Sequence, residues 1–258
     1  MAGRLKSFGV ADGAWKLPEN SLESDSICYC AGAGENVSFD VALVNQFGCD
    51  VHIFDPTPRA IAHFETLRDR TNDGVPMPIT NSTKHYEATD QTITKMHFHP
   101  FGVYGSNQTL RFYAPRDSRH VSHSVRNLQG TKDYFEAKCK TVRKLMDELG
   151  HNHLDLLKLD IEGAEHSVID HLLVDQLRPR LLCIEFDAAF QQHEYAVAVE
   201  DLRRLVRFGY DLLDIKFWNA TLVARDKQPQ FATRLKLFKL GWRARRKTKQ
   251  SKAAQKAA

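Results

Sequence analysis

Two glycines and an aspartate stand at a spacing suited to holding a ribose. Gly32 and Gly34 follow the short apolar segment Ser26–Cys30, and Asp55 ends a second apolar segment 21 positions after Gly34. Glycines let a backbone turn tightly beside a ligand, and a helix that begins after the turn offers unpaired N–H groups. An acidic residue about 20 positions on, at the tip of the next strand, can accept both ribose hydroxyls. We therefore expect a nucleoside-bearing cofactor at this turn.

The residues around the turn favour a sulfonium cofactor over a dinucleotide. A dinucleotide fingerprint needs a third small residue, but that position is Val37, whose branched side chain obstructs close packing of helix on strand. Glu35 beside the turn would repel a pyrophosphate, whereas its charge suits S-adenosylmethionine. Gly32, Gly34, Glu35 and Asp55 are therefore predicted to bind S-adenosylmethionine. A plain tight turn is one alternative, and an NAD-dependent oxidoreductase on a similar sheet is another.

A second group of polar residues ends the apolar segment Leu154–Leu159. Lys158, Asp160 and Glu162 alternate there with apolar residues. Polar groups at the end of a buried strand are costly unless they are paired or functional. We expect Asp160 to face the reacting centre, where it would steer the acceptor or, as the less favoured alternative, a metal ion. Glu162 is a second catalytic candidate, and a structural ion pair between Lys158 and Glu162 is the competing interpretation.

Three segments of the sequence resemble the FkbM-type methyltransferases. They are Gly32–Asp40, Val51–Pro58 and, most specifically, the string Lys158-Leu-Asp160-Ile-Glu162-Gly163-Ala-Glu165. The similarity extends from about Asp12 to Arg225. It implies a class I methyltransferase fold with S-adenosylmethionine as the methyl donor. It also implies a hydroxyl oxygen as the acceptor, on a small molecule, a sugar or a lipid.

A third apolar segment, His97–Val103, supplies another wall of the predicted site. Residues that follow the third strand of such a sheet should flank the adenine ring. Gly102 would allow the ring to approach closely, and Val103 would pack against it. Both are predicted cofactor-binding residues, with an ordinary strand ending as the alternative.

Several histidines are candidates for proton transfer. His123 lies in a polar insert that could cover the cleft, with His120 nearby, and His166 follows the acidic string. Each is a candidate general base because imidazole titrates near neutral pH, although solvated or packing roles are the alternative for each. Pairs such as His97 and His99 lack the helical His-x-x-x-His spacing of a zinc site, so no metal site is predicted.

Alternating apolar and amphipathic segments predict the elements that position these residues. Short apolar segments typical of buried strands alternate with stretches of helical period. Strands are predicted at 26–30, 49–54, 97–103, 154–159, 180–186, 210–216 and 221–225, with an outlying strand at 109–113. This alternation predicts an α/β, Rossmann-like fold: a mostly parallel, seven-stranded sheet with an antiparallel edge and helices on both faces.

Length and composition fit one large α/β domain, with 258 residues, 42% hydrophobic and 26% charged. We expect an N-terminal arm at 1–25, a methyltransferase domain at 26–233 with an insert at about 105–140, and a basic C-terminal helix or tail at 234–258. No apolar run approaches the roughly 18 residues of a membrane span, and no signal peptide is evident. The five cysteines are expected to be buried and reduced, which fits a cytoplasmic protein.

The net charge of +4 conceals an uneven distribution. Ten of the 36 basic residues and none of the 32 acidic residues lie in 234–258, so residues 1–233 carry 26 basic and 32 acidic residues. An acidic body argues against a core that grips nucleic acid. The tail's first part interleaves apolar and basic residues and could bind an anionic membrane or RNA, or simply pack on the body. A non-catalytic module recruited by this tail is a further alternative to an enzyme.

Overall fold

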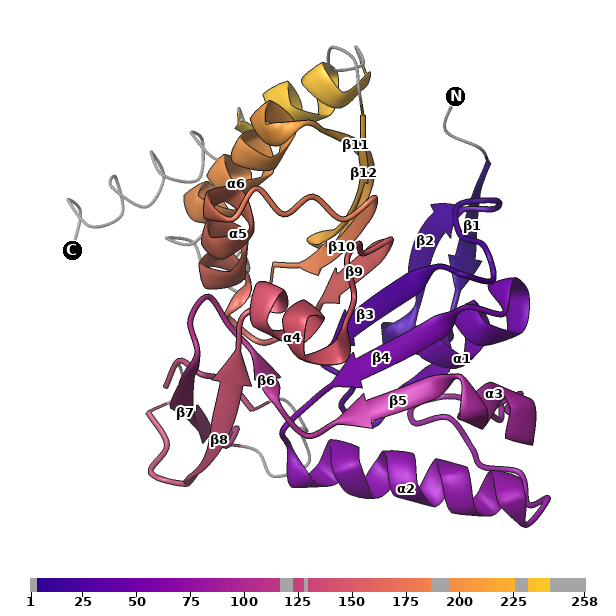
Figure 1. Ribbon diagram of the computed structural model, residues 1–258. Coiled ribbons are helices and arrows are strands. Elements are labelled where there is room, and N and C mark those ends of the chain that lie inside the picture. The colour runs from indigo at the N-terminus through magenta and orange to yellow at the C-terminus, as the bar shows by residue number, and fades with distance from the viewer. Residues whose placement is uncertain (1–3, 117–122, 128–129, 187–194, 226–231, 242–258) are drawn as a thin grey trace.

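The computed structural model describes residues 4–116, 123–127, 130–186, 195–225 and 232–241, and Figure 1 shows their arrangement. Its centre is a seven-stranded sheet with the strand order β11-β12-β10-β9-β3-β4-β5. The strands are β3 (Ile27–Ala31), β4 (Asp50–Phe54), β5 (Met96–His99), β9 (Leu156–Leu159), β10 (Leu181–Glu185), β11 (Tyr210–Lys216) and β12 (Asn219–Ala224). Six of these strands are parallel, and β12 runs antiparallel to both of its neighbours. The predicted mostly parallel sheet with an antiparallel edge is confirmed.

Helices cover both faces of this sheet, as the alternation of segments predicted (Figure 1). One face packs against α4 (Val142–Leu149), α5 (Glu165–Val174) and α6 (Tyr195–Phe208), and the other against α1 (Ser38–Phe47) and α2 (Pro58–Asn72). The short α3 (Asp90–Thr94) follows a polar stretch in which the sequence shows no period. Thr57 and Thr141 cap the starts of α2 and α4, since their side chains accept backbone N–H groups. Local capping therefore fixes where these helices begin.

The segment expected as an N-terminal arm contributes to the core. Strands β1 (Leu5–Phe8) and β2 (Trp15–Pro18) form an antiparallel hairpin around the single 3₁₀ turn η1 (Ala11–Gly13). Trp15 and Leu17 are buried in the same apolar cluster as α1 and α2. The Oγ1 of Thr221 in β12 donates to the carbonyl of Lys16 at 2.9 Å, which ties the hairpin to the sheet. Residues 5–18 thus belong to the folded body.

A second, three-stranded sheet begins at the end of the segment 97–103, and its strand order is β6-β8-β7. Its strands are β6 (Gly102–Val103), β7 (Gln108–Tyr113) and β8 (Tyr134–Lys140). The strand predicted at 97–103 is divided, because Pro100 has no N–H to give to a ladder. The first part stays in the main sheet as β5, and the second pairs with β8. Strand β8, which the sequence analysis did not predict, makes up the far side of the insert.

The chain is helical again at 232–241, where Leu240 joins the apolar cluster beneath α6. The rest of the predicted basic tail, 242–258, lies outside the described residues. In the part of the chain that the structure describes, no helix combines the length and the apolar character needed to cross a membrane.

Candidate active site

A cavity of about 410 Å³ opens where β3, β4 and β9 end. Ligands of open α/β sheets collect at this edge, beside the point where the strand order reverses. Nine of the ten predicted site residues line it; these are Gly32, Gly34, Glu35, Asp55, Gly102, Val103, His123, Asp160 and Glu162. The tenth, His166, is not among the lining residues. The fold therefore gathers groups from five separate segments of the sequence.

The glycine turn is shaped by the strand beside it. Gly32 has a φ of +83°, and a Cβ built on it would lie 1.6 Å from the carbonyl oxygen of Asp160. A side chain at this position would therefore collide with the backbone that follows β9. The N–H of Gly32 donates to the carbonyl of Phe54 at 2.9 Å, so the turn is tied to strands on both sides. Glycine is required at position 32 because the ends of β3 and β9 pack closely against each other.

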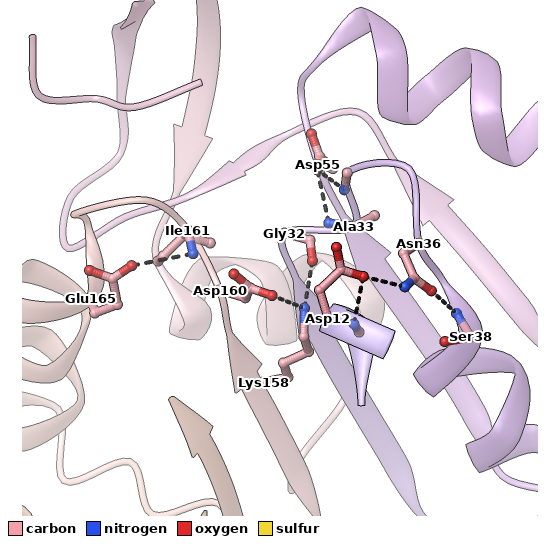
Figure 2. A network of polar contacts seen from close by, with 12 residues as sticks. Asp12, Gly32, Ala33, Asn36, Ser38, Asp55, Lys158, Asp160, Ile161 and Glu165 are labelled. Carbon is pink, nitrogen blue, oxygen red and sulfur yellow. Dashed lines mark hydrogen bonds and ion pairs between the residues drawn. The ribbon is translucent and has the colours of Figure 1, made fainter. Parts of the chain in front are cut away.

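Asp55 fastens the same turn with its side chain (Figure 2). One carboxylate oxygen accepts the N–H groups of Ala33 at 2.8 Å and Gly34 at 3.0 Å. The other accepts the N–H of Thr57 at 2.8 Å and its hydroxyl at 2.6 Å. Asp55 is only 5% exposed, and these four donors occupy the lone pairs of both oxygens. The carboxylate that was expected to receive ribose hydroxyls is already committed to the protein backbone.

Other N–H groups of the turn also have acceptors within the protein. Asn36 N–H donates to the carbonyl of Ala33 at 3.1 Å, and Ser38 N–H donates to the Oδ1 of Asn36 at 3.1 Å. The N–H of Val37 donates to the hydroxyl of Tyr86 at 3.2 Å. A phosphate-binding turn instead directs such N–H groups at its ligand. This turn is therefore poorly suited to a pyrophosphate.

Lys158 joins the turn to the acidic string. Its Nζ lies 3.0 Å from a carboxylate oxygen of Asp160 and donates to the carbonyl of Gly32 at 2.6 Å (Figure 2). Burial alone would lower the pKa of Lys158, but the negative charges of Asp160 and Asp40 outweigh it and raise the pKa overall. The lysine is therefore charged, and it pairs with Asp160. The predicted alternative of a Lys158–Glu162 pair is wrong, because Lys158 faces α1 from within β9.

The loop after β9 is held by its own last acidic residue. Glu165 is buried at the start of α5, and its carboxylate accepts the N–H groups of Ile161 at 3.3 Å and Gly163 at 3.1 Å. Burial raises the pKa of Glu165 to about 7. Glu162 has a φ of +52°, and its carbonyl accepts the hydroxyl of Ser124 at 2.6 Å. A left-handed backbone at a residue other than glycine is strained and is common at functional sites.

Glu35 lines the cavity but also forms an ion pair with Arg59 of α2. The Nε–Oε1 distance is 3.0 Å and the Nη2–Oε2 distance is 2.8 Å, which is a two-pronged contact. The guanidinium compensates the charge that was expected to form an acidic lip at the turn. The acidic character of the site comes instead from deeper carboxylates.

The insert supplies the opposite wall of the cavity. Gly102 and Val103 are buried, and a Cβ on Gly102 would lie 2.5 Å from the Sγ of Cys139 in β8. Phe112 of β7 and His123 line the cavity from the same insert. The imidazole of His123 packs edge-on against Phe135, with 5.3 Å between ring centroids. His120, the other histidine candidate in this insert, lies outside the described residues.

His166 lies on the surface between α5 and α6. Its Nδ1 is 2.7 Å from a carboxylate oxygen of Asp201, and its Nε2 is 3.5 Å from Asp170. Arg204 contacts both of these aspartates, Asp201 at 3.0 Å and Asp170 at 2.5 Å. The candidate base therefore belongs to an ion-pair network away from the cavity.

Sequence reasoning missed the wall contributed by the N-terminal hairpin. Asp12 and Gly13 line the cavity, together with Asn81. The amide of Asn36 donates to Asp12 at 2.8 Å and to the carbonyl of Val10 at 3.0 Å, which locks the hairpin onto the glycine turn (Figure 2). The family resemblance already begins at Asp12, but the place of these residues at the cavity depends on a contact across more than 20 positions of sequence.

Asp40 and Glu185 are two further acidic lining residues that the site prediction omitted. Asp40 is buried in the first turn of α1, and burial raises its pKa. Glu185 ends β10, beside the strand that carries Asp160. The signal for Glu185 was available, since it ends a predicted strand at the edge where ligands bind.

Four histidines gather on the sheet away from the cavity lining, and we call His52, His97, His99 and His151 the histidine cluster. The Nδ1 of His52 lies 3.0 Å from the Nε2 of His99, and its ring stacks on His97 with 4.7 Å between centroids. Burial lowers the pKa of His52 to about 3 and also lowers those of His99 and His151. Among the described residues, no three His, Cys, Asp or Glu side chains are grouped to hold a metal ion.

The strand order, the single reversed strand β12 and the cavity at the carboxyl ends of β3, β4 and β9 define a Rossmann-like fold of the class I methyltransferase type. The chain belongs to the FkbM methyltransferase family, whose domain model, "Methyltransferase FkbM domain", matches residues 29–212. The chain is 22% identical over 186 residues to "Probable methyltransferase-like protein 24" of Homo sapiens. That alignment covers 72% of this chain and 38% of the human protein.

Solved structures of methyltransferases are also similar. An FkbM methyltransferase from Methylobacillus flagellatus KT aligns with a TM-score of 0.44 and 15% identity, over 79% of this chain and 44% of its own. An rRNA methylase from Streptococcus thermophilus aligns with a TM-score of 0.37 and 12% identity, over 80% and 90% of the two chains. Precorrin-6y C5,15-methyltransferase from Geobacter metallireducens GS-15 aligns with a TM-score of 0.40 and 10% identity, over 84% of this chain and 95% of its own. Since these scores are below 0.5, the family assignment rests on the domain match.

Proposed function

We propose that the protein transfers a methyl group from S-adenosylmethionine to a hydroxyl oxygen of a small molecule, a sugar or a lipid. The occupied N–H groups of the glycine turn carry this proposal. Asp55 accepts those of Ala33 and Gly34, and neighbouring acceptors take those of Asn36, Val37 and Ser38. A pyrophosphate would find few donors here, whereas the positively charged sulfonium centre of S-adenosylmethionine needs no N–H donor. Family membership supports the same choice over hydride transfer with NAD.

The charges around the cavity agree with a positively charged cofactor. Among its described lining residues, seven carry carboxylates, of which Glu35 is compensated by Arg59, and Lys158 alone has a permanently charged cationic group. Lys158 is committed to Asp160 and to the Gly32 carbonyl. Clefts lined by one sign of charge concentrate ligands of the opposite sign. The cavity volume of about 410 Å³ lies in the range of small-molecule sites, roughly 300–1,000 Å³.

The lining residues divide into a cofactor part and an acceptor part. Gly32, Gly34 and Glu35 would hold the methionine portion, with Asp55 fixing the shape of the turn beneath the ribose. Gly102 and Val103 would flank the adenine. When bound, S-adenosylmethionine supplies a methyl group on sulfur, which an acceptor oxygen takes in a single in-line displacement.

On the acceptor side, His123 is the proposed general base. It lines the same cavity as Asp160 and Glu162, so it can receive the proton of a hydroxyl that Asp160 orients. The insert packs over the cavity through Phe112 and His123 and would exclude water from the reacting pair. We also propose a reducing, cytoplasmic setting, because all five cysteines are free and buried.

Calorimetry tests the donor. S-adenosylmethionine and S-adenosylhomocysteine should both bind, and NAD should not. Binding of NAD alone would overturn the proposal. A fully ¹³C-methyl-labelled donor, incubated with pools of sugars, lipids and small alcohols, then tests the acceptor, since the carbon resonance of an O-methyl group differs from that of an N-methyl group.

Two histidine substitutions test the proposed general base. His123→Gln should abolish turnover while leaving the affinity for S-adenosylhomocysteine within about twofold of the original, and a general base contributes about 10²–10⁴ in rate. His166→Gln is the matched control and should keep full turnover, because His166 contacts Asp170 and Asp201 outside the cavity lining. Loss of turnover in His166→Gln alone would reverse the assignment.

A further inference from the structure

The helical residues 232–241 divide into an inward and an outward side. On the inward side, the Oγ1 of Thr233 donates to Asp211 at 3.1 Å and accepts the N–H of Leu212 at 3.2 Å. The Nζ of Lys236 donates to the carbonyls of Leu212 and Leu213, and Leu240 packs into the core. These contacts fix the helix on β11, so its orientation on the body is set by specific bonds.

The outward side carries two apolar side chains with no such partners in the body. Leu235 is 41% exposed and Phe238 is 72% exposed. They stand three residues apart and therefore occupy neighbouring positions on one face of the helix. Arg234 and Lys239, also exposed, flank them. Large apolar groups held in water between basic ones are typical of helices that lie in a membrane interface.

The charge around this face is positive. From Arg234 to the end of the given sequence there are ten basic residues and no acidic one. On the neighbouring helix α6, Arg203 and Arg207 share one carboxylate, Glu200, at 3.3 Å and 2.6 Å, so this triad keeps a net positive charge. A second copy of the chain would present the same charge to this face and be repelled. An anionic surface is complementary to it.

We propose that the outward face of residues 232–241 docks on an anionic lipid surface, with Leu235 and Phe238 inserted among the lipid head groups. Basic residues close to an anionic leaflet are each attracted to it, and the apolar pair adds affinity that charge alone does not give. RNA is a poorer match, since single strands bind to several planar rings that stack on successive bases, and of the exposed pair only Phe238 is such a ring. The proposal does not depend on which molecule accepts a methyl group.

Vesicle co-sedimentation of the full chain tests this docking. Vesicles that contain phosphatidylserine should bind the protein at least about tenfold more tightly than vesicles of phosphatidylcholine alone, and added salt should weaken the binding. The double variant Leu235→Ser with Phe238→Ser should bind at least about tenfold more weakly. Phe217→Ser is the matched control, because Phe217 is 76% exposed on the β11–β12 turn, and it should bind as the original does.

Three results would overturn the proposal. The first is equal binding to neutral and anionic vesicles. The second is unchanged binding of the double variant together with loss of binding in a chain that ends at Gly241, which would assign the attraction to the basic residues 242–258 alone. The third is binding to single-stranded RNA without binding to vesicles. Because both substituted side chains are exposed, the double variant should unfold at the same urea concentration as the original, and this separates docking from folding.

Discussion

Asp55→Asn tests whether the carboxylate at the end of β4 acts mainly on the protein or directly on a ligand. In the structure, its two oxygens accept four hydrogen bonds, two from the glycine turn and two from Thr57. An asparagine keeps one oxygen, which can still accept the N–H groups of Ala33 and Gly34. Its amide nitrogen then faces Thr57, whose hydroxyl can rotate to accept, but whose N–H cannot.

The expected loss in the free energy of unfolding follows from these four hydrogen bonds. One buried N–H loses its acceptor, which costs about 1–3 kcal/mol, and the two bonds to the turn change from charged to neutral acceptors. Because the charge of Asp55 is 95% buried, replacing it by a neutral amide offsets part of this loss of stability. We expect a net loss of about 2–3 kcal/mol in the free energy of unfolding, without any cofactor present. Asp55→Ala, which removes all four bonds, should lose more.

Urea unfolding of the cofactor-free protein measures this loss, and calorimetry with S-adenosylhomocysteine follows on the same samples. The affinity should fall together with the stability, because a loosened turn no longer shapes the cavity. Asp12→Asn is the control, since Asp12 lines the same cavity from an exposed position, and asparagine keeps the oxygen that accepts the amide of Asn36, so stability should stay within about 0.5 kcal/mol. If Asp55→Asn unfolds like the original and loses only its affinity, the ribose, not the backbone, is the partner of Asp55.

Other perturbations probe the turn, the buried lysine and the histidine cluster. Gly32→Ala should prevent folding or cost well above 2 kcal/mol, whereas Gly74→Ala, with a φ of +68° and no atom within 4 Å, should cost about 1 kcal/mol in urea unfolding. Lys158→Met should cost about 3–5 kcal/mol by the same measurement, because it leaves buried carboxylates unpaired; a loss below about 1 kcal/mol would contradict that pairing. His52 has a folded pKa of about 3 against an unfolded value of about 6.5, so its contribution is complete above pH 6.5 and is lost as pH falls towards 3, by at most about 1.4 kcal/mol per pH unit. The difference between the unfolding midpoints at pH 7.5 and 5 should therefore be smaller in His52→Phe than in the original protein, and unchanged in the exposed control His85→Asn.

The fold was predictable because its signals are local and repeated. Four core strands, β3, β4, β9 and β10, are short apolar runs that are each followed by a helix, and this alternation leaves few arrangements other than a parallel sheet. Strand β8 escaped prediction because most of its inward-facing side chains are only half-buried, so the strand has no run of strongly apolar residues. The hairpin of β1 and β2 escaped because turn residues dominate a segment whose burial depends on a distant partner.

The sequence by itself determined that the residues after β3, β4 and β9 meet at the cavity, since carboxyl ends of parallel strands share one edge of a sheet. It could not determine what those residues do to one another. Only the tertiary structure decided that Asp55 is held by the turn, that Arg59 neutralises Glu35 and that Lys158 pairs with Asp160. It also placed His123 at the cavity and His166 away from it. Residue types and spacing fix which groups are available, but hydrogen bonds and ion pairs form between atoms that only the packed chain brings within about 3 Å.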